Sequence, residues 1–188
     1  MLMQVVAAGG VLALLTVAPG PDMAVVTRQA IASGRVDGMR TVAGIVVGLL
    51  VWGVLTVAGV AAVLAASARA YLVVRVIGGA YLVFLGVRAL WHSRRDARPP
   101  AASGLGGTVG PGSAFRTGLF CNLLNPKIAV FYTGLLPTLA PVGLPPASGM
   151  ALLVLLHAPL SLVWLGSYAY MLSRARSFVR EASGPSDH

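Results

Sequence analysis

Two short stretches of the sequence decide how the chain folds: VAPGPDMAVV, residues 17–26, and LLNPKIAVFY, residues 123–132. Each places a helix-breaking cluster inside an apolar run, and each has one ionisable residue beside the break, Asp22 in the first and Lys127 in the second. Proline cannot donate a backbone N–H, and its ring collides with the preceding turn. Both runs are therefore predicted to form interrupted helices whose backbone groups are left unpaired at the break.

The composition predicts that lipid surrounds the chain. Hydrophobic residues make up 57% of its 188 positions and charged residues 10%, and the mean hydropathy is +0.84. About 20 helical residues cross a bilayer core of about 30 Å. We therefore expect an all-α, polytopic transmembrane helical bundle with spans near residues 2–18, 41–66, 70–91, 114–136 and 149–172. A cleaved signal peptide is the alternative for the first segment, although no Lys or Arg precedes its apolar run.

The basic residues predict the orientation, because positively charged short loops stay in the cytoplasm. The chain has 14 basic residues, of which 11 arginines fall in or beside the first and third connections or after the last span, whereas two fall between the second and third spans. This places the N-terminus outside and the C-terminus inside, with residues 94–113 as a cytoplasmic linker and 174–188 as a cytoplasmic tail. The net charge of +9 is then explained by topology and anionic membrane lipid, with no nucleic acid as a partner.

The two halves of the chain correspond at an offset of 105 residues, which sets Pro21 over Pro126. Residues 1–93 form a first transmembrane repeat and 114–173 an incomplete second one, entered from the opposite side. We therefore expect an inverted repeat of three-helix units with the sixth helix missing. Interrupted helices at matching positions of inverted repeats point to a secondary transporter with its site near the midplane.

The residues at the breaks form the predicted substrate site. Asp22 is expected to cap a half-helix over residues 23–33, and Asn125 with Pro126 to start a second half-helix. Two positive helix ends and one carboxylate would suit a substrate that carries both a carboxylate and an ammonium group. In the alternative interpretation Asp22 only caps a helix and Lys127 extends to the membrane surface. The predicted substrate-binding residues are Gly20, Pro21, Asp22, Asn125, Pro126 and Lys127.

Other features carry less weight. His157, close to Pro159 in an apolar run, is either a proton relay together with Asp22 or a single hydrogen-bonded histidine. Gly44 and Gly48 form a GxxxG pattern that predicts close helix packing. Cys121 is the single cysteine, which excludes an internal disulfide, and no cluster has metal-ligand spacing. We expect no metal, no cofactor and no enzymatic activity.

Three segments resemble the LysE/RhtB superfamily of bacterial amino-acid exporters: PGPDMAVVTRQAIASGRVDGMRTVAGIVVGLLVWG, VIGGAYLVFLGVRAL and FRTGLFCNLLNPKIAVFY, which begin at residues 19, 76 and 115. The resemblance implies export of an amino acid across the bacterial inner membrane, driven by the proton-motive force, in a fold of six hydrophobic segments. The sixth segment is absent here, so we expect a homodimer in which a neighbouring subunit fills that position. The alternative is a truncated member without transport activity that packs against a full-length relative.

Overall fold

The computed structural model describes residues 2–67 and 113–182 and isolated positions between 69 and 87, without the side chains of residues 60–66 and 176–182. All regular secondary structure in these residues is helical, which confirms the predicted all-α class. The predicted third span, residues 70–91, lies outside the described residues apart from those isolated positions. The predicted linker, residues 94–113, also lies outside them except for Ser113, and so does the tail beyond Ala182.

The first half of the chain begins with a broken helix. Helix α1 spans Leu2–Val17 and α2 spans Pro21–Ser33, and their axes are bent by 51° at the break. Helix α2 begins one residue before Asp22, with Gly20 as its N-cap residue and no side-chain cap. The prediction that Asp22 caps this helix is therefore wrong. Proline is favoured at the first helical position, so Pro21 starts the helix and Asp22 falls in its first turn.

The second half begins with a similar break. Helix α5 spans Ser113–Leu123, and the chain continues as α6 (Pro126–Val130), the π-helical segment η1 (Phe131–Leu135) and α7 (Leu136–Leu139), bent by 48° from α5. The predicted cap is confirmed here, because Asn125 Oδ1 accepts a hydrogen bond from the Lys127 amide at 3.0 Å. Helix α6 thus begins at Pro126 as α2 begins at Pro21, which is the correspondence that the offset of 105 residues predicts.

Two long helices complete the described bundle. Helix α3 spans Arg35–Ala66 and α8 spans Pro146–Ala182. Both contain a stretch long and apolar enough to cross a membrane, and each bent pair can count as one further span. Four of the five predicted spans thus have counterparts in the described residues. Helix α8 continues beyond the predicted end of the last span at residue 172.

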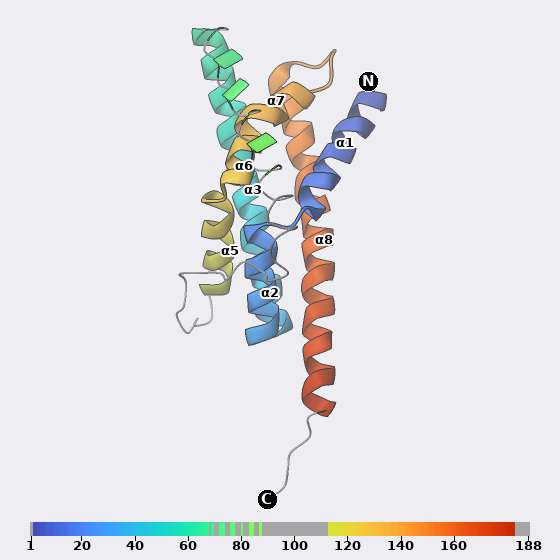
Figure 1. The fold of residues 1–188 in the computed structure, drawn as a ribbon. Coiled ribbons are helices and arrows are strands. Elements are labelled where there is room, and N and C mark those ends of the chain that lie inside the picture. Colours follow the sequence, from blue (N-terminus) through green and yellow to red (C-terminus); the bar gives the residue numbers. More distant parts are fainter. Residues whose placement is uncertain are drawn as a thin grey trace, which may run out of the picture.

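The halves run in opposite directions (Figure 1). The chain descends through α1 and α2 and returns through α3, whereas it rises through α5, α6 and α7 and descends through α8. This antiparallel arrangement of two broken helices and two long helices is the one expected of inverted repeats.

Helices α3 and α5 pack closely where glycines remove side chains from both partners. A Cβ atom at Gly44 would collide with the Phe115 carbonyl oxygen, and one at Gly118 would collide with the Thr41 carbonyl oxygen. At Gly48 an added Cβ would lie 2.7 Å from Asn122 Oδ1. The packing role predicted for Gly44 and Gly48 is confirmed, and Gly48 also makes room for a polar side chain of the second half.

Candidate substrate site at the two helix breaks

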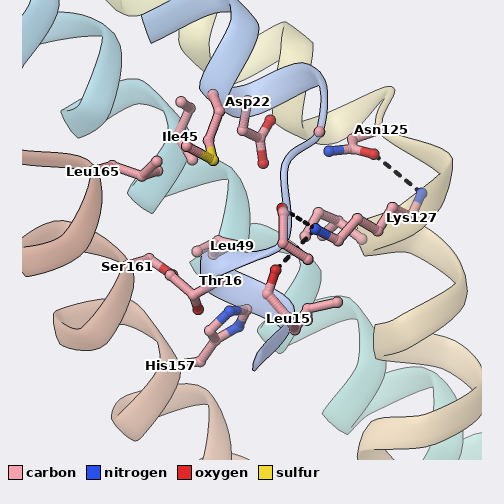
Figure 2. A pocket seen from close by; sticks show the side chains of 14 residues that line it. Leu15, Thr16, Asp22, Ile45, Leu49, Asn125, Lys127, His157, Ser161 and Leu165 are labelled. Atoms are coloured by element: carbon pink, nitrogen blue, oxygen red, sulfur yellow. Dashed lines mark hydrogen bonds between the residues drawn. The ribbon is translucent and has the colours of Figure 1, made fainter. Parts of the chain in front are cut away.

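The two breaks meet at a small cavity with a volume of about 30 Å³. Residues from both halves line it: Leu15, Thr16, Ala18, Gly20, Asp22, Met23, Ile45, Leu49, Asn125, Lys127, Ile128, His157, Ser161 and Leu165. Figure 2 shows that Asp22 and Asn125 lie on one side of this space and His157 and Ser161 on the other.

Asp22 contributes a carboxylate that the second half of the chain holds in place. Its Oδ2 accepts a hydrogen bond of 2.9 Å from Asn122 Nδ2, although 100 residues separate the two in sequence. Its Oδ1 is buried and has no hydrogen-bond partner among the described residues. Asp22 lies in the first turn of α2, where the helix dipole favours a negative charge. One oxygen of the carboxylate is therefore fixed, and the other is left for a further donor.

Lys127 reaches back from the second half to the end of α1. Its ammonium group donates to the carbonyl oxygens of Leu15 and Ala18, both at 2.8 Å (Figure 2). In a continuous helix the Leu15 carbonyl would accept from the amide four residues later, but that residue is Pro19, which has none. Lys127 thus replaces the hydrogen bond that the proline removes and places a positive charge at the negative end of α1.

The charges of Asp22 and Lys127 remain separate. No ion pair within 4.0 Å joins them in the described residues, although each lies within electrostatic range of the other. An ammonium group has three N–H donors, and two of those of Lys127 are used by α1. The cavity therefore presents one carboxylate oxygen and one ammonium hydrogen that have no partner among the described residues.

On the opposite side of the cavity, α8 contributes His157, and the π-helical segment supplies the hydrogen-bond partner of this residue. His157 Nδ1 and the Tyr132 hydroxyl are joined by a hydrogen bond of 3.0 Å, and both residues are buried. Tyr132 lies within η1, and π-helical segments occur frequently at functional sites. His157 is thus hydrogen-bonded and also lines the cavity, which is compatible with both interpretations of this residue.

Comparison with known proteins identifies the family. The profile of the LysE type translocator family matches residues 13–183, which is most of the chain. The chain belongs to the LysE type translocator family. Members of this family are transporters, so the chain is a multi-pass membrane protein with a transport role and not an enzyme. The expected superfamily is thereby confirmed.

The sequence of this family member is similar to those of membrane proteins from several bacteria. The threonine efflux proteins of Escherichia coli (strain K12) and Salmonella typhimurium (strain LT2) are each 30% identical over 132 residues, which cover 70% of this chain and 63% of theirs. The membrane protein YrhP of Bacillus subtilis (strain 168) is 22% identical over 175 residues, 90% of this chain and 83% of its own length. No solved structure matches the chain.

The structure of this LysE family member gathers most of the predicted site residues. Gly20, Asp22, Asn125, Lys127 and His157 all line the cavity. Two further predicted residues begin helices and are not among the lining residues: Pro21 starts α2 and Pro126 starts α6.

The sequence analysis missed three polar residues near the cavity, namely Asn122, Tyr132 and Ser161. Each is a polar side chain within an apolar run, which in a membrane span is itself a signal of function or of a specific partner. Asn122 lies three residues before Asn125, and Ser161 lies four residues after His157. The four-residue spacing on one helix could have placed Ser161 near His157 at the predicted site.

Proposed function

We propose that this protein exports amino acids from the cytoplasm and binds them in the cavity between the two helix breaks. The observation that carries the proposal is that Asp22 and Lys127, one from each half of the chain, line the same cavity. An amino acid carries one ammonium and one carboxylate on the same carbon atom. A cavity that holds a negatively charged hydrogen-bond acceptor and, apart from it, a positively charged hydrogen-bond donor is complementary to such a molecule.

The ammonium group of the substrate binds at Asp22. Oδ1 of this carboxylate is buried and accepts no hydrogen bond from the described part of the chain, and leaving such an oxygen unpaired costs about 1–3 kcal/mol or more for a charged group. An ammonium donor supplies the missing hydrogen bond together with the opposite charge. Asn122 keeps the carboxylate oriented while the site fills and empties.

The carboxylate of the substrate binds on the Lys127 side. The third N–H of this ammonium group is available, because Leu15 and Ala18 accept from only two. Asn125 lies near both charges; its oxygen accepts from the Lys127 amide and its amide nitrogen is directed toward Asp22 (Figure 2). Gly20 adds no side chain and leaves the α1–α2 break open to the substrate.

Protons supply the driving force in this proposal. Asp22 is the one acidic side chain among the residues that line the cavity, so a proton and the substrate ammonium compete for the same oxygen. Protonation from outside releases the substrate, and loss of the proton to the cytoplasm restores the charged site. His157 lines the same cavity and can pass a proton to it.

The proposed orientation has the N-terminus outside and the C-terminus in the cytoplasm, in the bacterial inner membrane. Two of the arginines that carry this prediction lie at one end of the bundle, since Arg35 stacks 4.7 Å from the centre of the Tyr170 ring and Arg174 donates to the Tyr170 hydroxyl at 3.2 Å. Clustering of positive charge at one end is what the topology rule requires of the cytoplasmic side. Anionic lipid head groups are the proposed partners of these arginines.

Export of threonine tests the proposal. Cells are fed a threonine dipeptide, which releases threonine inside, and intracellular and external threonine are measured with the protein, with an empty vector and with an uncoupler of the proton gradient. We expect lower internal threonine in cells that make the protein, and loss of this difference with the uncoupler. Absence of any difference, repeated with dipeptides of several other amino acids, would favour the alternative of a packing partner without transport activity.

A further inference from the structure

The side of the cavity opposite Asp22 carries two polar side chains from α8. His157 and Ser161 are four residues apart, so they project from the same face of the helix. Only 2% of His157 and 3% of Ser161 is exposed, and both residues line the cavity. Ile45, Leu49 and Leu165 form apolar walls beside them. A polar patch enclosed by apolar walls can recognise a specific group on a ligand.

The Ser161 hydroxyl has no hydrogen-bond partner among the described residues. A serine or threonine within a helix usually satisfies its hydroxyl by donating to the carbonyl four residues earlier. Thr16, Thr27 and Thr133 do this, each at 2.8 Å. Ser161 does not, so within the described part of the chain a side chain that is 97% buried keeps a free donor and a free acceptor at the cavity wall.

His157 adds a second donor beside this hydroxyl. The buried phenol of Tyr132 needs an acceptor for its hydrogen, and Nδ1 of His157 is the partner present in the described residues. If Tyr132 donates, Nδ1 accepts and the neutral ring carries its hydrogen on Nε2. This tautomer is assigned from the hydrogen-bond pattern, and it gives His157, which lines the cavity one helical turn from Ser161, an N–H donor.

We propose that Ser161, assisted by Nε2 of His157, binds the side chain of the substrate and selects a short side chain that bears a hydroxyl over an apolar one of the same shape. This inference rests on the proposed function, because it assumes that Asp22 and Lys127 hold the backbone groups of an amino acid. A site with buried polar groups rejects an isostere without a hydroxyl, since the isostere leaves those groups unpaired. Apolar walls alone cannot make this distinction.

Threonine and valine provide the test, because they differ by a hydroxyl in place of a methyl group. Cells that make the full chain are preloaded with both labelled amino acids, and the ratio of their efflux rates is measured. Ser161→Ala removes the hydroxyl with little change of volume, and Ser173→Ala makes the same change on the same helix at a residue that does not line the cavity. Antibody detection in isolated membranes shows that all three proteins are present in equal amount.

We expect the native protein to prefer threonine and Ser161→Ala to lower the threonine-to-valine ratio roughly three- to tenfold, from the net value of one hydrogen bond. Ser173→Ala should keep the native ratio. Ser161→Thr, which restores a hydroxyl, should retain a higher ratio than Ser161→Ala. A native protein that exports both amino acids without preference, or an unchanged ratio in Ser161→Ala, overturns the inference and leaves the proposed export intact. Export of neither amino acid overturns the inference, and the proposed export falls with it only when the dipeptides of the other amino acids also show no difference.

Discussion

Replacement of Asp22 by Asn separates a structural role of this residue from a role in binding. Asparagine has the same shape, and its amide oxygen can accept the hydrogen bond that Asn122 Nδ2 now gives to Oδ2. Its amide nitrogen takes the place of Oδ1, which has no partner in the described residues. The substitution also removes a buried negative charge, so we expect Asp22→Asn to fold and to reach the membrane in normal amount.

Transport should respond very differently. If Asp22 binds the substrate ammonium, the substitution removes a desolvated ion pair worth roughly 2–5 kcal/mol, or a factor of about 30 or more in affinity. Efflux of labelled threonine from preloaded cells resolves such a loss. The matched control is Asp37→Asn, since Asp37 forms an exposed ion pair with Arg40 at 3.0 Å, a type of contact worth about 0–1 kcal/mol. Normal efflux by an Asp22→Asn protein present at normal level would refute the assignment of Asp22 to the site.

Three further predictions concern packing, topology and assembly. Gly44→Ala should lower the melting temperature in detergent by several degrees, because the added Cβ would collide with the Phe115 carbonyl oxygen. Gly9→Ala should have little effect, because no described atom lies within 4 Å of its added Cβ. Equal melting temperatures of the two variants would contradict the packing argument. A reporter fused after Arg98, which lies outside the described residues, should be cytoplasmic and one inserted near Gly143 external, and the reverse labelling would invert the topology. Single copies in nanodiscs should not transport if the working form is a homodimer, and transport by such copies would rule the dimer out.

The sequence predicted those parts of the structure that depend on local chemistry. Proline has no amide hydrogen wherever it occurs, so the breaks at Pro21 and Pro126 could be located without any tertiary information. The cap at Asn125 is likewise local, since its partner is two residues away. The wrong cap at Asp22 arose where two local preferences compete. Pro21 at the first helical position determines the start of the helix, and Asp22 is left to interact elsewhere.

The contacts within the site were beyond sequence reasoning because they join distant parts of the chain. The offset of 105 residues predicted that the two breaks correspond, but not which atoms meet. The Asn122 amide pairs with Asp22 across 100 residues, and the Lys127 ammonium pairs with Leu15 across 112. The π-helical segment at Phe131–Leu135 has no proline and no capping pattern that would announce it. Its effect, the placement of Tyr132 against His157, follows only from the packed structure.

These long-range contacts also suggest how binding is linked to movement. Asn122 and Lys127 belong to the second half of the chain, and both bind groups of the first half at its break. In the proposed mechanism the substrate binds to the same carboxylate and the same ammonium group. Occupancy of the cavity therefore changes the free energy of the contacts that join the halves, and a ligand can shift a conformational equilibrium only through such differential interactions. Because the two halves of the chain meet at the site, rocking one half against the other in the proposed mechanism would open it to alternate sides of the membrane.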